Sequence, residues 1–398
     1  AEALKIAISG AGVAGPALAH WLHRSGHEPT LIERAPHFRT GGYVIDFWGV
    51  GYRVAQLMGI EAAIREAGYQ VQSIRSVGPD NQVRASVGVD AFRRATGAGF
   101  TSLPRGDLAA TIYATIEDDV ETIFGDSITA INEHPDGVNV SFAQAKSRDF
   151  DLVIGADGLH SNVRRLTFGP ESDVEHYLGC RVAACVVETY RPRDDLVYVT
   201  YSEPGRSIGR FTLRGDRTLF LFVFRSSHAA DPGNVEARKE ILRREYGAAG
   251  WECPHILTAL DGVDDLYFDV VSQIRLDRWS RGRTALVGDA AACVSLLAGE
   301  GTGLAMTEAY VLAGELACAR GDYRRAFDAY ETRLRHFVEA KQGAAQKYLP
   351  VFATQTRLGI WFRNLAMRTM NFRPLAELLL TRSVRDDFEL PNYPTMST

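Results

Sequence analysis

Cysteine, long apolar runs and excess positive charge are all scarce or missing in this sequence of 398 residues. The five cysteines are Cys180, Cys185, Cys253, Cys293 and Cys318, and no two of them have CxxC spacing. Their odd number and scattered positions argue against a disulfide framework, a zinc site and a dithiol redox centre. The sequence also has no HExxH motif, so we expect no metal site, and no GxSxG motif, which argues against an α/β-hydrolase.

No run of about 18 apolar residues occurs, so we expect neither a transmembrane helix nor a signal peptide. The formal net charge is −5, from 44 Lys+Arg and 49 Asp+Glu, which gives no indication of a nucleic-acid or membrane surface. The length and the 46% hydrophobic content are typical of a globular protein with two domains. We therefore expect a cytoplasmic monomer or homodimer whose partner is a small molecule.

The first 34 residues have the pattern of a dinucleotide-binding unit. The apolar stretch KIAIS predicts a strand, and Gly10, Gly12 and Gly15 form a GxGxxG motif before a predicted helix. These glycines allow a tight turn, a close approach of a pyrophosphate and close packing of helix on strand. The second predicted strand ends at Glu33, which can accept hydrogen bonds from a ribose. The residues predicted to bind the dinucleotide here are Gly10, Gly12, Val13, Ala14, Gly15, Glu33 and Arg34.

The GxGxxG segment alone does not separate FAD from NAD, and four further stretches decide which dinucleotide is expected. They are RTGGYVIDFWGVG with Arg39 and Asp46, SLPRGDLAATI with Arg105, DLVIGADGLHSNVRR with Asp157, and GDAAACVSLLAGEGTGLAM with Asp289. Their order and spacing over roughly residues 4–375 resemble the group A flavoprotein aromatic monooxygenases, the family of p-hydroxybenzoate hydroxylase and of tetracycline-modifying flavin monooxygenases. A second GxGxxG is absent, as the resemblance implies, because NADPH or NADH would bind only transiently.

The resemblance implies an α/β fold in which a Rossmann-type FAD domain is interleaved with a β-sheet substrate domain and followed by C-terminal helices. It implies that FAD, NAD(P)H and O₂ hydroxylate an aromatic substrate through a flavin C4a-hydroperoxide. Carried over by position, Asp289 would bind a ribityl hydroxyl and Arg105 the extended FAD. The further residues carried over are Arg39, Asp46, Asp157, Gly158, Arg164, Gly301, Thr302 and Gly303.

The expected position of the flavin explains why glycines occur next to Thr302. They open a predicted helix, whose N-terminal N–H groups would face the flavin and stabilise its negative charge when reduced. Only small residues allow the backbone to come so close.

The chain alternates between the two predicted domains. The FAD domain is expected at 1–72, 101–175 and 271–340, the substrate domain at 73–100 and 176–270, and bracing helices at 341–398. In the predicted strand TLFLFVFR, one face carries Phe220, Phe222 and Phe224, which could meet a flat ring or pack against helices. The residues predicted to contact substrate are Phe47, Arg210, Phe220, Phe222, Phe224, Leu296 and Leu297.

The sequence departs from the family pattern after Gly288-Asp289. Ala292 stands where the family has His, and Ser295 and Leu296 stand at its usual prolines. The resulting apolar wall favours a polycyclic substrate of the natural-product type, as in antibiotic biosynthesis, over a small benzoate. No catalytic base is identified. An FAD oxidase or dehydrogenase, a plain NAD dehydrogenase and a non-catalytic flavin-binding protein remain alternatives.

Overall fold

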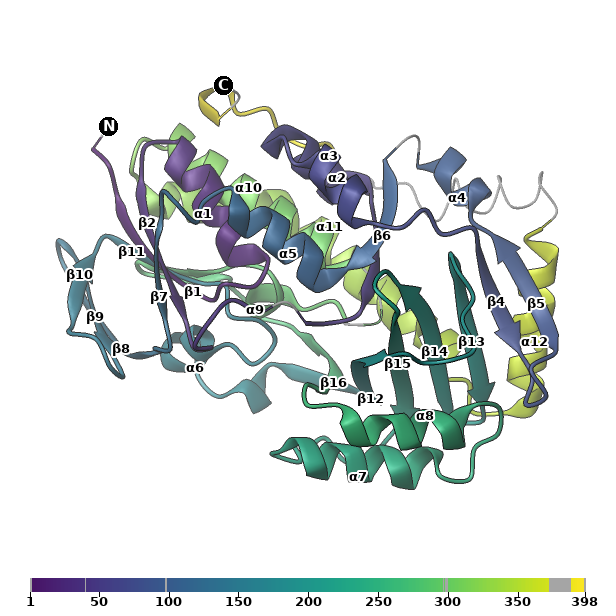
Figure 1. Cartoon of the computed structure of the whole chain (residues 1–398). Helices are drawn as coiled ribbons and strands as arrows, with labels where there is room; N and C mark the ends of the chain where they lie inside the picture. Colours follow the sequence, from purple (N-terminus) through teal and green to yellow (C-terminus); the bar gives the residue numbers. More distant parts are fainter. Residues whose placement is uncertain are drawn as a thin grey trace.

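Two sheets of different kinds form the two halves of the molecule (Figure 1). The computed structural model describes residues 2–39, 41–96, 99–295, 297, 300–371 and 388–396. The helix and sheet content agrees with the predicted FAD-binding monooxygenase fold. Within the described residues, none of the helices combines the length and apolarity that crossing a bilayer requires.

The first half is built on a six-stranded sheet in the order β17-β18-β11-β1-β2-β7. All neighbouring pairs are parallel except β17 with β18. These strands are β1 (Lys5–Ser9), β2 (Glu28–Glu33), β7 (Glu121–Phe124), β11 (Leu152–Gly155), β17 (Ser280–Arg281) and β18 (Thr284–Leu286). A three-stranded meander of β8 (Ile128–His134), β9 (Gly137–Phe142) and β10 (Arg148–Phe150) shares its core.

The main helices of this half are α1 (Ala14–Arg24), α5 (Arg105–Ala114), α6 (Asn162–Phe168), α9 (Asp289–Ala292) and α10 (Gly301–Cys318). Of these, α1, α6 and α9 begin after the carboxyl ends of the parallel strands β1, β11 and β18. A two-stranded ribbon of β3 (Val44–Trp48) and β6 (Phe100–Pro104) leads to α2 (Gly49–Met58), α3 (Glu61–Ala67) and α4 (Asp90–Ala95). Helix α10 packs between α1, α2 and α11.

The second half is a seven-stranded, mainly antiparallel sheet in the order β16-β12-β15-β14-β13-β4-β5. Its strands are β4 (Ser73–Val77), β5 (Val83–Gly88), β12 (Glu175–Glu188), β13 (Val197–Glu203), β14 (Arg206–Leu213), β15 (Arg217–Arg225) and β16 (Tyr267–Ile274). Helices α7 (Val235–Tyr246) and α8 (Cys253–Ala259) cover one face, and α12 (Arg357–Thr369) packs beside β5 (Figure 1). Short 3₁₀ turns occur at Glu171–Asp173, Leu260–Gly262 and Pro394–Met396.

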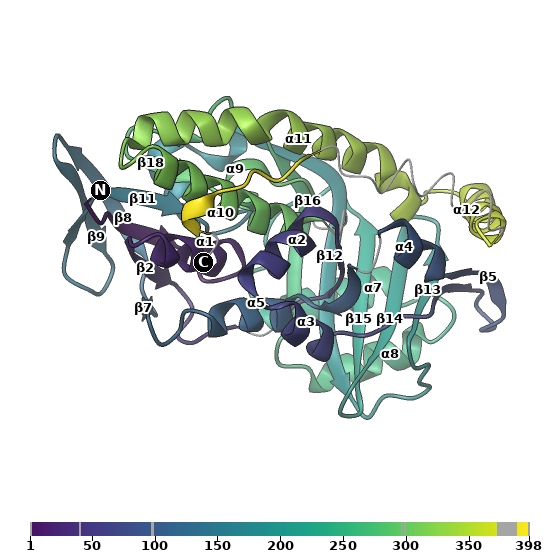
Figure 2. The same cartoon turned by 90° about the horizontal axis from the view of Figure 1, so that it is seen from above.

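Helix α11 (Tyr323–Phe352) runs along both halves, as Figure 2 shows from above. Its Gln342 is buried and donates from Nε2 to the carbonyl oxygens of Ile274 and Cys293. Gln273 of β16 donates in return to the Gln342 carbonyl. Because the same glutamine binds β16 and the segment after α9, the helix ties the seven-stranded sheet to the loops of the first half.

Candidate active site

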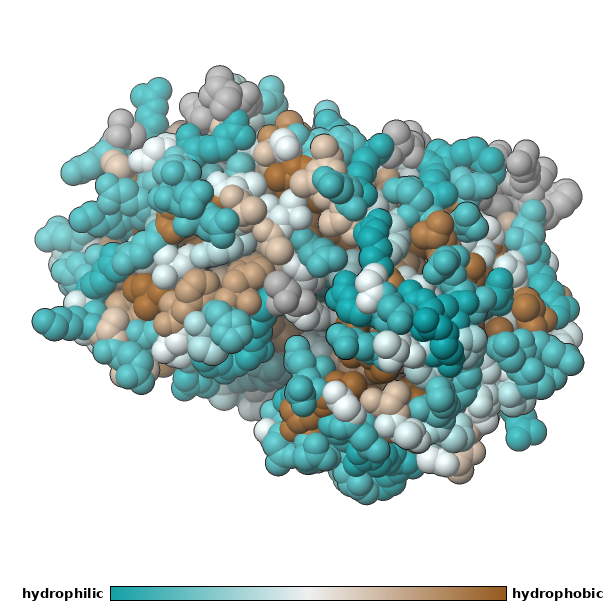
Figure 3. Space-filling model, in the orientation of Figure 1, coloured by the Kyte–Doolittle hydropathy of each residue, from teal (hydrophilic) through white to brown (hydrophobic). Residues whose placement is uncertain are grey.

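A cavity of about 2350 Å³, called the main cavity below, opens where the two halves meet (Figure 3). Its walls are the loops after β1, β2 and β11, the first turn of α10, and parts of β12 and β16. Many of the residues predicted to bind FAD line it, namely Gly10, Gly12, Val13, Ala14, Glu33, Arg34, Arg39, Arg105, Asp157, Gly158, Asp289, Gly301 and Thr302. Segments far apart in the sequence therefore form one continuous wall.

The glycines of the first loop have the geometry that a dinucleotide cradle needs. Gly10 has φ +108°, and a Cβ there would lie 2.3 Å from the Ala156 carbonyl oxygen. A Cβ on Gly15 would lie 1.9 Å from the Gly10 carbonyl oxygen, so Gly15 acts through close packing and not as part of the wall. A Cβ on Gly12 would meet only Arg105 Nη2, at 3.5 Å, which leaves that backbone open to a ligand.

Glu33 lies at the end of β2 and shapes the same loop. Its Oε1 accepts a hydrogen bond from the Ala11 N–H at 3.2 Å, and its Oε2 accepts one from the Ala35 N–H at 2.9 Å. Each carboxylate oxygen can accept more than one hydrogen bond, so the side chain can hold the turn and still bind a ribose hydroxyl. The fit to an adenosine end is good.

Asp157 fixes the loop after β11. Its carboxylate accepts hydrogen bonds from the Ser9 hydroxyl at 3.0 Å and from the N–H groups of Asn162 and Val163 at 3.0 and 3.1 Å, and it also contacts the Ser161 hydroxyl. Burial raises its pKa, and these hydrogen bonds oppose the rise. Asp157 thus orders the start of α6 at the cavity wall.

Arg164 does not reach the main cavity, which corrects its predicted role as a cofactor ligand. The side chain is 1% exposed and donates to the carbonyl oxygens of Leu159 at 2.7 Å and Ala290 at 3.1 Å. It also forms an ion pair with Glu171 at 2.7 Å. Arg164 therefore joins the loop after β11 to α9 from behind the wall, and the DGxxSxVR motif could not separate this supporting role from direct contact.

Asp289 and the first turn of α10 form the far end of the main cavity. Burial raises the pKa of Asp289, and the positive charge of Arg105 lowers it. Helix α10 begins at Gly301 without a side-chain cap, so the N–H groups of its first turn are available to an anionic or hydrogen-bonding ligand. A Cβ on Gly301 would lie 3.6 Å from Asp289 Oδ1, which shows how close the two groups are.

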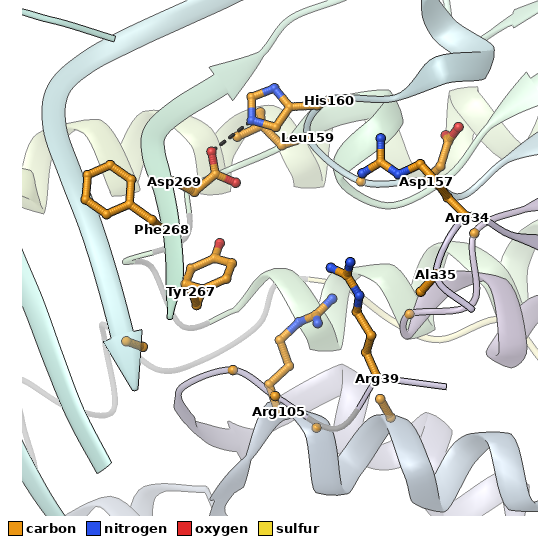
Figure 4. Close-up of a pocket in the computed structure, with 18 of the residues that line it drawn as sticks. Arg34, Ala35, Arg39, Arg105, Asp157, Leu159, His160, Tyr267, Phe268 and Asp269 are labelled. Carbon is orange, nitrogen blue, oxygen red and sulfur yellow. Dashed lines mark hydrogen bonds and ion pairs between the residues drawn. The ribbon is translucent and has the colours of Figure 1, made fainter. Parts of the chain in front are cut away.

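Arg39 and Arg105 point into the main cavity from the same side (Figure 4). Tyr43 and Tyr267 were not among the predicted site residues, yet they line the cavity with ring centroids 5.9 Å apart. Tyr43 directly follows Gly41-Gly42 in a stretch that the motifs had already marked. Tyr267 lies in a segment without a motif, and only the pairing of β16 with β12 brings it to the site.

His160 links the two halves at the cavity edge, as the dashed line to Asp269 in Figure 4 shows. Its Nδ1 is 2.8 Å from Glu171 Oε2, and its Nε2 is 2.8 Å from Asp269 Oδ1. Hydrogen bonds to Asp269 and Glu171 raise the pKa of the imidazole to about 10. His160 is thus a cation at neutral pH that joins the loop after β11 to β16.

Gly303 and Asp46 lie outside the main cavity. Gly303 packs against α2, where a Cβ on Gly51 would lie 2.3 Å from the Gly303 Cα. Gly303 and Asp46 line a separate hollow of about 30 Å³, called the small hollow below. Phe47 is buried beside Tyr52 with ring centroids 5.6 Å apart, so the predicted substrate contact of Phe47 is corrected to a core contact.

The predicted aromatic face of β15 is also corrected. Phe220, Phe222 and Phe224 are buried in one cluster with residues of α7 and α8, so the helices and not a substrate cover them. The opposite face carries Leu219, which packs with Phe211 of β14 toward β3 and β6. The alternation of side chains along a strand shows which residues share a face, but it does not show which layer packs against each face.

Arg210 lies on the helix-covered face of the sheet opposite Phe220. It is 2% exposed, contacts the carboxylates of Asp194 and Glu252, and lies 5.3 Å from the centroid of the Trp251 ring. Its predicted substrate role is therefore corrected to a structural one. Leu297 is half-buried against Cys180 and its neighbours, and Leu296 lies outside the described residues.

Comparisons with known proteins agree with this geometry. The FAD binding domain family matches residues 3–343. A flavin-dependent monooxygenase of Legionella longbeachae is 33% identical over 98% of each chain, and an uncharacterised protein of Mycobacterium tuberculosis is 38% identical over 87% of this chain and 93% of its own. The crystal structure of tetracycline destructase Tet(51) has a TM-score of 0.84 at 30% identity, covering 98% of this chain and 100% of that one.

The glycine cradle, the Glu33 carboxylate at the end of β2 and the uncapped first turn of α10 thus fit FAD, and the match extends over most of the chain. This chain belongs to the FAD-binding family of flavin-dependent monooxygenases and is an FAD-dependent enzyme.

Proposed function

We propose that the protein is an NAD(P)H-consuming monooxygenase that hydroxylates an aromatic, polycyclic substrate of the natural-product type. One observation carries the proposal: the main cavity connects the glycine cradle to the first turn of α10 and then continues between the two halves. A cofactor bound along this path would present its reactive end where the seven-stranded sheet faces the first half. FAD, when bound, supplies the redox and oxygen chemistry.

The chain's own residues hold and polarise the cofactor in this proposal. Arg39 and Arg105 point into the space between the glycine cradle and α10, where they can neutralise a pyrophosphate. Asp289 would accept a hydrogen bond from a cofactor hydroxyl. The N–H groups at Gly301 and Thr302 would hold the cofactor ring and favour negative charge on it.

The nicotinamide donor is proposed to bind transiently in the wide part of the main cavity. This part is lined by β12 and β16 and extends to the loop around Asp265, well beyond the glycine cradle. His160 and Arg181 lie at this wall, but the imidazole is bonded to Glu171 and Asp269 and the guanidinium donates to the Ala230 carbonyl oxygen, so we assign neither to the donor.

The polycyclic class is supported by the apolar wall on the substrate side. Tyr43 and the β16 residues Tyr267, Phe268 and Val270 line the main cavity on this side. The structural relative Tet(51) is a tetracycline destructase, and tetracycline is a polycyclic compound of this kind. A small carboxylate would need a dedicated arginine, and Arg210 is engaged elsewhere.

The proposal is tested with purified FAD-loaded protein. NADPH and NADH are each mixed with it under anaerobic conditions, and bleaching of the flavin absorbance reports reduction. Oxygen uptake is then measured over hydroxyanthraquinones, tetracyclines and simple hydroxybenzoates, with ¹⁸O₂ to detect label in the product. We expect polycyclic phenols to stimulate uptake and to gain one labelled oxygen. Hydrogen peroxide without labelled product would identify an oxidase, and stimulation by hydroxybenzoates alone would contradict the substrate class.

A further inference from the structure

Helix α12 turns an apolar side away from the rest of the protein. Its exposed large apolar residues are Leu358, Trp361, Phe362 and Leu365, whose exposed fractions lie between 42% and 64%. They recur at the i, i+3, i+4 and i+7 positions of the helix, so they form one stripe along it, called the apolar stripe below. A surface helix normally packs such a stripe against the core, so an exposed one indicates a binding surface.

Hydrogen bonds on the side that faces the sheet hold the helix in this orientation. Asn364 Oδ1 accepts a hydrogen bond from the Ser76 hydroxyl at 2.9 Å, and Arg368 Nε donates to the Arg84 carbonyl oxygen at 2.6 Å. Ser76 lies in β4 and is 2% exposed, so Asn364 faces the sheet. Turning the apolar stripe inward would break both hydrogen bonds and leave the buried Ser76 hydroxyl unpaired, which is costly.

The charged residues of α12 are all positive. They are Arg357, Arg363 and Arg368, and the helix has no acidic residue. Arg357 and Arg368 are exposed. Arg357 lies four residues before Trp361, and Arg368 lies three residues after Leu365, so both border the apolar stripe. The formal net charge of −5 for the whole chain therefore hides a positive surface at this helix.

The strands beside α12 leave this positive charge in place. The helix packs against β5 and β13. Strand β5 has no acidic residue, and the acidic residue of β13, Glu203, contacts Arg206 and accepts a hydrogen bond from the Gly250 N–H. In the turn between β4 and β5, Asp80 pairs with Arg84 at 3.4 Å. These nearby carboxylates are thus matched by groups outside α12.

Helix α12 lies at the end of the molecule that is farthest from the six-stranded sheet (Figure 1 and Figure 2). All of its residues, 357–369, are described, and none of them lines the main cavity or the small hollow. A flat partner can therefore reach the apolar stripe without covering the residues proposed to hold the cofactor.

The chemistry of this side of α12 matches an anionic lipid surface. Leucine, tryptophan and phenylalanine side chains enter the boundary between headgroups and acyl chains, and bordering arginines are attracted to anionic lipids. A second copy of the helix would match the apolar residues but would bring two sets of arginines together, and these would repel each other. Charge complementarity therefore favours a lipid surface over self-association.

We propose that α12 docks this protein on an anionic bilayer, with the apolar stripe inserted among the headgroups and with Arg357 and Arg368 against lipid phosphates. The contact is peripheral and reversible, because one short helix inserts only its apolar stripe. Docking through α12 does not require the hydroxylation proposed above, but the two are compatible, since an apolar polycyclic compound also partitions into a bilayer.

The test measures binding of the full-length, FAD-loaded protein to sucrose-loaded vesicles by co-sedimentation. One set of vesicles is phosphatidylcholine alone, and the other is an equal mixture of phosphatidylcholine and phosphatidylglycerol. The variants are Leu358→Ser, which shortens the apolar stripe, and Arg357→Gln combined with Arg368→Gln, which removes its bordering charges. Leu57→Ser is the matched control, because Leu57 is 47% exposed on another helix, α2. FAD content and thermal unfolding check that each variant is folded.

We expect wild type to bind the anionic vesicles, to bind them less at high salt, and to bind phosphatidylcholine vesicles weakly. Leu358→Ser should weaken anionic binding by about tenfold, because an inserted leucine side chain is lost. The double arginine variant should weaken it by about tenfold or more, and Leu57→Ser should bind like wild type. The Trp361 emission, taken as the difference between wild type and Trp361→Phe, should shift to the blue on binding.

No binding to anionic vesicles, equal binding to both kinds of vesicle, or an equal loss in Leu57→Ser would overturn the proposal. Self-association without lipid that Leu358→Ser abolishes would also overturn it and assign the apolar stripe to a second copy. Trp361 emission that acrylamide fails to quench without lipid would show that the chain itself covers the stripe, which again contradicts docking. None of these outcomes bears on the hydroxylation proposed above.

Discussion

The buried carboxylate of Asp289 destabilises the free protein, and we expect the same carboxylate to stabilise bound FAD. Burial raises its pKa, which means that the surroundings disfavour its charge before a ligand binds. Asp289→Asn should therefore leave the apoprotein as stable as wild type or more stable. It should weaken FAD by about tenfold or more, through loss of a charge-assisted hydrogen bond worth about 1.5–3 kcal/mol.

The measurement is a fluorescence titration of apoprotein with FAD, combined with urea unfolding of the apoprotein. Asp264→Asn is the control, since Asp264 lines the wide part of the main cavity away from α9. Unchanged FAD affinity in Asp289→Asn would remove Asp289 from the cofactor site.

Arg210 shows how a charged residue in a predicted substrate strand can be structural. Arg210→Ala would leave the carboxylates of Asp194 and Glu252 without their shared cation. We expect this loss to lower the free energy of unfolding by about 3 kcal/mol, because removing one partner of a buried ion pair leaves the other charge buried without compensation. The KM for an aromatic substrate should stay the same, because the side chain lies on the face covered by α7 and α8.

Arg191→Ala is the matched control for Arg210. Its side chain is 60% exposed and pairs with Asp216, so it should cost at most about 1 kcal/mol. Urea unfolding checks both variants. A raised KM in Arg210→Ala at unchanged stability would restore the substrate role that the sequence analysis gave it.

Individual residues were predictable where their role is local. Gly10 and Glu33 belong to one strand–turn–helix–strand unit, so spacing along the chain fixes their spacing in the structure. Arg164 belongs to an equally clear motif, but whether its side chain points to the cavity or behind the wall depends on Ala290, which is 126 residues away. That information is tertiary and is not contained in the motif.

At the scale of elements, the crossing of α2 and α10 decides where the first turn of α10 lies. The Cβ of an alanine at position 51 would lie 2.3 Å from the Gly303 Cα, so Gly51→Ala must push the helices apart. We expect a loss of about 1–3 kcal/mol of stability from this overpacking. FAD affinity should also fall, because the N–H groups of α10 would move.

Thermal unfolding and FAD titration of Gly51→Ala test this prediction. Gly88→Ala is the control, because Gly88 lies in β5 and a Cβ there meets nothing within 4 Å. Full FAD affinity in a destabilised Gly51→Ala would show that the position of the helix start tolerates this shift.

The two faces of β15 show what the sequence pattern of a strand does not predict, which is the layer that packs against each face. Alternation predicted correctly that Phe220, Phe222 and Phe224 share one face. The sequence does not show that α7 and α8, which come after the strand, return to cover that face and leave the leucine face toward β3 and β6. The aromatic face of a correctly predicted strand was therefore expected to meet substrate, although helices cover it.

At the scale of the whole molecule, His160 is a charged connection between the two halves. It comes from the loop after β11 in the first half, and its partner Asp269 lies on β16 of the second. The carboxylates of Asp269 and Glu171 raise the pKa of His160 from 6.5 to about 10. A pKa raised on folding means that protonation stabilises the folded state.

The contribution of His160 to stability should fall as the pH rises. The stabilisation from His160 should be fully present below pH 6.5, the value in the unfolded chain, and should be lost as the pH rises toward about 10. His160→Gln cannot carry the charge, so wild type should exceed it in stability at pH 6 and approach it near pH 10. Because the imidazole is 53% exposed, salt should reduce the difference.

The experiment is urea unfolding of FAD-saturated protein at several pH values between 6 and 10, at low and high salt. His228→Gln, which alters an exposed histidine on the seven-stranded half, is the control and should follow wild type throughout. A constant difference between wild type and His160→Gln over this range would show that the histidine packs between the halves without carrying charge. A difference that closes with rising pH would show that one proton helps to hold the two walls of the active site together.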